Sequence, residues 1–299
     1  MSKGSCRLER KENTLALALC LAIAAAALAI CSRSSPLYPI NDWVDSNCFF
    51  TVGKAMLSGK TVYLDIYEQK GIFLYFLHAL AYLVSPRSFF GVYLIEVASF
   101  AAFLYITYRI SRLFSGRAAS VACLAPLSLA VLCTRAFCQG DSAEQLLMPL
   151  LLYPVYCLLR SLAEGRGGVP TKRETAAVGV LFTLTLLTKF TLIGVFFGCA
   201  VVLILICIIR REMALCLSRA LYFLAGVAAA AVPAVVYLAA NGALPAFFEV
   251  YFYNNMFLVH DVYHFSNIQH IYHHYKTYMC QIHGIFHLKP LHNNYHPHY

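Results

Sequence analysis

Charged side chains are scarce in this sequence. Asp, Glu, Lys and Arg make up 12% of its 299 residues, against about 25% in an ordinary soluble domain. Hydrophobic residues make up 60%, and apolar runs near the roughly 18 residues that cross a bilayer recur along the chain. This composition excludes an ordinary soluble domain and predicts an all-α, multi-span membrane protein that meets membrane lipids.

Several motifs are missing. None of the twelve cysteines forms a C-x-x-C pair, so zinc binding and thiol-redox chemistry gain little support. Cys133 and Cys138 could pair in an oxidising compartment, which the sequence leaves open. No G-x-x-x-x-G-K-[ST] motif is present, so no nucleotide site is predicted. The net charge of +9 is interpreted as a sign of orientation in the membrane, and we predict no nucleic-acid partner.

Seven transmembrane helices are predicted. The apolar runs lie at 14–31, 71–84, 89–108, 118–134, 143–159, 175–209 and 215–239. The 175–209 run would form a helix of about 52 Å, too long for one span, so we predict a hairpin that turns at Lys189. The 71–84 run is short, which is typical of an interfacial or re-entrant piece. The 14–31 run is interpreted as a retained span, and a cleaved signal peptide is the alternative.

The distribution of basic residues predicts the orientation. If 71–84 does not cross, fourteen Lys and Arg residues share one side: the N-terminus, 109–117, 160–173 and 210–219. The other side holds seven: Arg33, Lys54, Lys60, Lys70, Arg87, Arg135 and Lys189. Because basic residues concentrate on the cytoplasmic side, we predict a cytoplasmic N-terminus and a large outer loop at 32–88.

The outer loop contains a predicted amphipathic helix over 45–58, ended by Gly59. Asp45 lies near its first turn. That position suits a helix cap, and it equally suits a general base held at the membrane surface. The sequence does not decide between these two interpretations.

Other charged residues fall on the same predicted side. Asp65, Glu68 and Lys70 lie within "YLDIYEQKG", either as a solvated loop or as a polar site for a phosphate or a sugar. Glu144 follows "GDS" in a pattern that also predicts a helix cap. Lys189 stands between two apolar segments, where it either reaches the interface or meets a lipid phosphate.

One further acid, Glu96, lies inside the 89–108 run. A buried acid in a membrane span is a functional candidate by default. Glu96 is only two turns from the outer end of that run, so we expect it to reach water there.

Four segments in this order resemble the GT-C superfamily of membrane glycosyltransferases, and especially its protein-mannosyltransferase and aminoarabinose-transferase group. They are "DSNCFFTVGKAMLSGK", "YLDIYEQKGIFLYF", "GDSAEQLLMP" after the "RISRLFSGR" connection, and "GVLFTLTLLTKFTLIGV". The resemblance covers roughly residues 14 to 255. It implies an inverting enzyme of the plasma membrane that moves a sugar from a polyprenyl-phosphate carrier to an acceptor hydroxyl at the outer face.

The resemblance also implies roles for single residues. Asp45 matches the general base, with Asp42 as second choice. Glu68 matches an acid that contacts the sugar or a divalent metal ion, which is the one cofactor the resemblance admits. Lys70 and Lys189 match cations facing the carrier phosphate. Asp65 belongs to the family's Tyr-x-Asp segment, and we expect Glu144 to point into the same cleft.

The chain departs from the family after about residue 258. Family members usually have more spans, and ten of the eleven histidines lie between His260 and Tyr299. We interpret residues 259–299 as an aberrant, frameshifted or truncated tail, with metal binding as the alternative. The rival functions are a secondary transporter and a non-catalytic, truncated paralogue.

Overall fold

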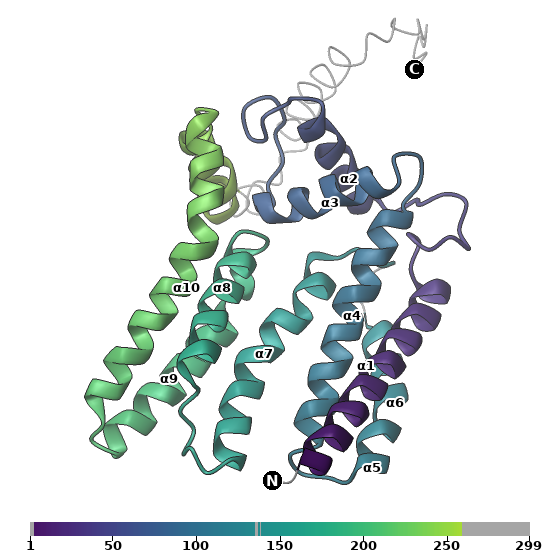
Figure 1. The fold of residues 1–299 in the computed structure, drawn as a ribbon. Coiled ribbons are helices and arrows are strands. Elements are labelled where there is room, and N and C mark those ends of the chain that lie inside the picture. The colour runs from purple at the N-terminus through teal and green to yellow at the C-terminus, as the bar shows by residue number, and fades with distance from the viewer. Residues whose placement is uncertain (1–2, 135–136, 138, 259–299) are drawn as a thin grey trace, which may run out of the picture. The chain divides into compact units, whose positions relative to one another are not determined.

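The computed structural model describes residues 3–134, 137 and 139–258, and every regular element in them is a helix (Figure 1). The chain divides into two compact units, residues 1–251 and 252–299. The predictions made for Cys138 and for the histidine-rich tail fall outside the described residues.

The helices, in chain order, are α1 (Lys3–Cys31), α2 (Val44–Leu57), α3 (Ile72–Val84), α4 (Phe90–Ser111), α5 (Arg117–Ala122), α6 (Leu124–Leu132), α7 (Ala143–Ala163), α8 (Lys172–Leu186), the 3₁₀ turn η1 (Phe190–Leu192), α9 (Gly194–Ile209), α10 (Met213–Ala240), α11 (Leu244–Phe247) and the π-helix η2 (Phe248–Leu258). Within the first unit, α4 packs against α1 and α7, α2 packs against α3, and α8 packs against α10.

Five stretches are long and apolar enough to cross a membrane: Lys11–Cys31, Phe90–Ser111, Ala143–Ala163, Phe190–Ile209 and Met213–Ala240. Five such helices are compatible with a multi-pass membrane protein. Two other predicted spans are shorter than this length. The 118–134 run forms α5 and α6, which together make the apolar stretch Arg117–Leu132, and the first half of the 175–209 run forms the 15-residue α8.

The short elements follow the sequence pattern closely. The predicted helix over 45–58 is α2, followed by Gly59 at φ +83°. The 71–84 run is α3, with 13 residues. The predicted interruption at Lys189 is also present, because α8 ends at Leu186 and α9 begins only at Gly194.

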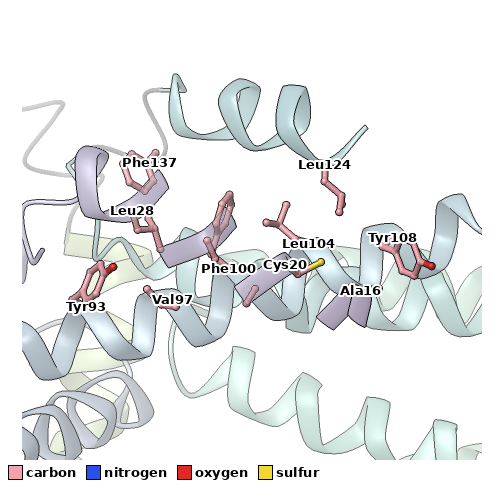
Figure 2. Close-up of a cluster of buried hydrophobic side chains, with 12 residues drawn as sticks. Ala16, Cys20, Leu28, Tyr93, Val97, Phe100, Leu104, Tyr108, Leu124 and Phe137 are labelled. Atoms are coloured by element: carbon pink, nitrogen blue, oxygen red, sulfur yellow. The ribbon is translucent and has the colours of Figure 1, made fainter. Parts of the chain in front are cut away.

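The main buried cluster joins α1, α4 and α6, as Figure 2 shows for ten of its members. Leu28 of α1, with Phe100 and Leu104 of α4, is completely buried there. In the spans that contain α9 and α10, only 11% of the 18-residue apolar stretch is buried inside the protein. These two helices therefore present apolar side chains outward, as helices facing hydrocarbon do.

Basic residues gather at one end of the first unit, which we call the basic end. Three contacts join its segments there: Arg117 with Glu12, Arg109 with the ring of Tyr156, and Arg219 with the carbonyl of Pro170. These contacts join α1 with α5, α4 with α7, and α10 with the segment that precedes α8. The opposite end holds α2 and α3 and is called the α2–α3 end below.

Candidate functional site

A buried ion pair stands at the centre of the α2–α3 end. The Nε2 atom of His78, on α3, lies 2.9 and 3.1 Å from the two carboxylate oxygens of Asp141, which precedes α7. The side chains of this pair are only 2% and 1% exposed. The pair therefore fastens α3 to the start of α7 in a place that water does not reach.

The geometry indicates which form of His78 is present. Its Nδ1 atom lies 2.8 Å from the carbonyl oxygen of Leu74, an acceptor, and Nε2 faces the carboxylate, a second acceptor. A neutral imidazole has only one N–H donor, so both contacts require the imidazolium. Burial alone would lower the pKa of His78, but the Asp141 carboxylate outweighs it and raises that pKa above its ordinary value.

The pair is extended by a chain of polar side chains. The Ser46 hydroxyl, on α2, donates to Asp141 over 2.6 Å, and the Asn41 amide donates to Ser46 over 3.1 Å. The backbone N–H of Asp141 donates to Glu96 over 2.7 Å, and the Ser32 hydroxyl donates to the other Glu96 oxygen over 2.8 Å. We call Ser32, Asn41, Ser46, His78, Glu96 and Asp141 the buried polar network. It joins α2, α3, α4 and the segment before α7.

Local backbone geometry places Asp141 in this network. Gly140 and Asp141 both have positive φ values, +92° and +53°, and Asp is one of the few side chains that tolerates this conformation. A Cβ atom at Gly140 would lie 2.3 Å from the Ser32 hydroxyl and 2.6 Å from Glu96. The predicted cap of α7 is confirmed as Ser142, whose side chain accepts from the N–H of Gln145. Asp141 is therefore available for His78.

Close packing brings α2 onto α3. A Cβ atom at Gly53 would lie 2.5 Å from the backbone nitrogen of Ala79 and 2.6 Å from the carbonyl carbon of His78. Only glycine allows this approach. Phe49, one turn earlier, packs edge-on against the His78 ring at 5.5 Å. The sequence thus allows α2 to lie against the helix that carries His78.

Two predicted substrate-binding residues contact each other. Lys189 forms an ion pair with Glu144, which lies in the first turn of α7. Both side chains are about one-third exposed. The contact puts a cation and an anion at the rim of the α2–α3 end, as the shared side of these residues predicted.

The segment with Lys70 is bound to the turn with Lys189 through the backbone. The N–H of Gly71 donates to the carbonyl of Thr188 over 3.0 Å, and that of Phe73 donates to Leu187 over 2.9 Å. A Cβ atom at Gly71 would lie 2.0 Å from the Leu187 oxygen, so this contact depends on glycine. Both predicted phosphate-facing lysines are therefore held on one joined piece of backbone.

Glu68 meets the first half of α2. The Cys48 thiol lies 2.8 Å from its carboxylate. Partial burial and the Glu68 carboxylate raise the pKa of that thiol, and Asp45 and Lys70 lie close enough to act on it electrostatically. Asp45, Cys48, Glu68 and Lys70 thus form one group beside the start of α2, which we call the acid–lysine group.

Asp45 itself is exposed in the first turn of α2, whose N-cap is Trp43 without a side-chain cap bond. The capping interpretation is therefore not supported for Asp45. Among the described residues, no hydrogen bond or ion pair engages its carboxylate. This leaves an acid at the surface whose charge is open to a ligand.

Two predicted residues are engaged elsewhere. Asp42 lies 3.6 Å from Arg33 in an exposed ion pair. Asp65 accepts the N–H of Thr61 over 2.7 Å and so closes its own turn. These contacts give Asp42 and Asp65 local roles, so neither is brought to the acid–lysine group by an observed contact.

Sequence reasoning missed His78 and misplaced Glu96. His78 is the one histidine outside the tail, and an ionisable residue in an apolar helix is a signal that could have found it. We expected Glu96 to reach water, and this is wrong, because its side chain is completely buried. Neither the sequence nor its periodicity places Gly140 and Asp141 against it.

Within the described part of the chain, no group of three or more His, Cys, Asp or Glu side chains is arranged to hold a metal ion. The Glu68 carboxylate accepts from a thiol and from the N–H of Gln69. The divalent metal ion that the resemblance admits stays a prediction.

Comparisons with family models, with curated proteins and with solved structures find no match for this chain.

Proposed function

We propose that this chain is an inverting membrane glycosyltransferase of the GT-C type. In this proposal it has seven spans and a cytoplasmic basic end, and its substrate is a sugar carried on a polyprenyl phosphate in a plasma membrane. The sugar is moved to an acceptor hydroxyl of a lipid, glycan or protein at the α2–α3 end. The observation that carries the proposal is the convergence of exposed Asp45 with Glu68, Lys70 and Lys189 at one end of an apolar helical unit.

The placement of charge supports the orientation. The proposal assigns the fourteen basic residues of the N-terminus, 109–117, 160–173 and 210–219 to the cytoplasm, and contacts there join α1 with α5, α4 with α7, and α10 with the segment before α8. In this proposal α3, which lies at the other end in Figure 1, does not cross the membrane. Positive charge on the cytoplasmic side then puts the α2–α3 end outside. α8, at 15 residues, and α5–α6 supply the two shorter spans.

In the reaction, the acceptor oxygen attacks the anomeric carbon of the sugar from one face. The bond from that carbon to the phosphate oxygen breaks on the other face, which inverts the centre. Asp45 takes the proton of the acceptor hydroxyl as general base. The polyprenyl phosphate leaves with the electron pair of the broken bond.

Two lysines stabilise that departure. Negative charge grows on the phosphate in the transition state, and fixed cations at a membrane boundary lower its energy. Lys189 is paired with Glu144 in the free protein, so phosphate binding exchanges one anionic partner for another. Lys70 is held next to this turn by the Gly71 and Phe73 bonds.

The buried polar network positions these groups without entering the reaction. Ser46, next to Asp45 in α2, is tied to Asp141 and through it to His78. This also gives Glu96 a structural role, because its oxygens bind Ser32 and the backbone of Asp141. In this proposal Glu96, a functional candidate because it lies in an apolar run, supports the fold and takes no part in the reaction.

A direct test uses Trp43, the only tryptophan in the chain, which lies two residues before Asp45. Protein in nanodiscs is titrated with polyprenyl phosphate while Trp43 fluorescence is recorded. Polyprenyl-phosphate [³H]mannose and [³H]glucose are then supplied, and release of the label from the lipid is measured. We expect saturable binding, and transfer that falls at least about a hundredfold in Asp45→Asn, as expected for loss of a general base.

The matched control is Asp65→Asn, whose carboxylate closes a local turn. It should keep binding and transfer within about twofold, as surface changes usually do. Binding that survives with no transfer in the wild type would favour the non-catalytic paralogue. Failure of both binding and transfer would refute the proposal.

A further inference from the structure

Two cysteines come together at the α2–α3 end, away from the acid–lysine group. α1 and the α5–α6 stretch lie side by side: Leu15 of α1 and Arg117 of α5 line one groove near the basic end. Leu28 and Phe137 share the buried cluster near the other end. The two stretches therefore run in the same direction over most of their length.

Cys31 and Cys133 lie at the same height along these two parallel stretches. Cys31 is sixteen residues beyond Leu15, and Cys133 is sixteen residues beyond Arg117. Sixteen residues of helix span about 24 Å at 1.5 Å per residue. Just beyond the two cysteines, the N–H of Arg33 donates to the carbonyl of Gln139 over 2.8 Å. The chains are thus still in contact past the level of the thiols.

The thiols themselves are near each other and accessible. Cys31 and Cys133 lie close enough to interact electrostatically. Both are free and exposed, unlike Cys20, Cys157 and Cys207, which are buried among apolar side chains. A disulfide requires Cα atoms about 4.4–6.8 Å apart, which neighbouring helix ends can reach with a small shift.

We propose that Cys31 and Cys133 form a disulfide at the α2–α3 end. The two thiols lose two protons and two electrons, a sulfur–sulfur bond forms, and the disulfide of a thiol–disulfide oxidoreductase is reduced to its dithiol. This chemistry requires that the α2–α3 end faces an oxidising compartment, because thiols remain reduced in the cytosol.

The bond joins the ends of α1 and α6 immediately before the chain enters the buried polar network. Ser32 follows Cys31 directly, and Gly140–Asp141 lies a few residues beyond Cys133. The disulfide therefore fixes the two segments that bind Glu96. It rests on the proposed orientation but not on the glycosyltransferase activity.

The test uses the full chain with a site-specific protease sequence inserted between Pro86 and Arg87, an exposed turn between the two cysteines. The protein is expressed in a bacterium whose periplasm contains thiol–disulfide oxidoreductases. Free thiols in the membranes are alkylated before solubilisation, and the cleaved protein is run on gels with and without reductant. We expect the two fragments to stay joined without reductant and to separate with it.

Four variants make the result specific. Cys31→Ser and Cys133→Ser should each separate the fragments without reductant. Cys123→Ser, with the exposed Cys123 nearer the basic end, and Cys138→Ser should leave them joined. Mass spectrometry of the unreduced digest should show the peptides of Cys31 and Cys133 linked, which tests the bond without a variant. Separation of the wild-type fragments without reductant, or joining that survives Cys31→Ser, would overturn the proposal.

Discussion

The buried ion pair of His78 and Asp141 predicts how much stability the protein loses when one partner is removed. In His78→Leu, the Asp141 carboxylate stays buried without its cationic partner. Removing one member of a buried ion pair typically costs about 3–5 kcal/mol, because an uncompensated charge remains. At roughly 2–4 °C per kcal/mol for chains of 150–250 residues, we expect the midpoint of thermal unfolding to fall by roughly 6–20 °C.

Asp141→Asn should cost much less. Asn tolerates the positive φ at this position, and its amide can donate to the Nε2 atom of a neutral His78. The hydrogen bond is then remade and the charge is removed. Adding Asp141→Asn to His78→Leu should therefore restore part of the lost stability, with a coupling free energy of about 0.5–3 kcal/mol between the two sites.

The same pair predicts a pH dependence. Because the pKa of His78 is raised in the folded protein, the folded state binds its proton more tightly than the unfolded state. This stability is fully present below the unfolded pKa of about 6.5. It is lost as the pH rises through the higher folded value. The wild-type midpoint should fall over that window by more than the midpoint of His78→Leu does.

Thermal unfolding in detergent, followed by the loss of monodisperse protein on size exclusion at pH 6 and pH 9, measures all four members of the cycle. Each is compared with Asp65→Asn as a surface control. Two results would refute the reasoning: a double variant as unstable as the sum of its single variants, or identical pH dependence in the wild type and His78→Leu.

Three further predictions follow from single contacts. Gly71→Ala places a Cβ atom 2.0 Å from the Leu187 oxygen and should destabilise the protein by about 1–3 kcal/mol. In the control Gly194→Ala, the added Cβ atom meets nothing within 4 Å, so thermal unfolding should be unchanged. Equal effects of the two variants would contradict the contact between Gly71 and Leu187. In the Trp43 titration, Lys189→Gln should weaken polyprenyl-phosphate binding about 10–150-fold, the effect of losing one hydrogen bond to a charged group. Lys189→Arg keeps the charge and should bind within a few fold of the wild type. Equal losses of binding in both variants would argue against a role for the charge. The Gln145 side chain is 2% exposed, and its amide has no hydrogen-bond partner among the described residues. Gln145→Met should therefore be neutral or raise the free energy of unfolding by up to about 3 kcal/mol. A clear fall in the midpoint of thermal unfolding would mean that the amide forms a hydrogen bond.

The local elements were predictable because each has a strong local cause. Apolar length sets the long helices, Gly59 ends α2, and Ser142 caps α7. The interruption at Lys189 followed from a helix too long for one span. Glu144 and Lys189 were placed on one side by counting crossings, and the structure brings them into contact.

The buried polar network was not predictable in the same way. His78 and Asp141 are 63 residues apart, and Ser46 and Asp141 are 95 apart. No periodicity in a single segment contains such pairings. They depend on how α2 and α3 pack, and close backbone contacts hold α2 against α3 at Gly53 and the start of α3 against Leu187 at Gly71. The sequence around these two glycines does not predict which backbone atoms will pack against them.

Adjacent residues of α2 therefore have opposite tasks. Ser46 points into the protein and holds the helix through Asp141, while Asp45 beside it is exposed. A general base must be held rigidly by residues that packing and hydrogen bonds lock in place. The buried pair of His78 and Asp141 does this because it anchors Ser46 and stays out of reach of the substrate. On this reasoning, loss of the Ser46 hydroxyl should lower the transfer rate more than it lowers carrier binding. Ser46→Ala in the Trp43 titration and in the transfer assay would separate these two effects, and an equal loss in both would show that Ser46 only maintains the fold.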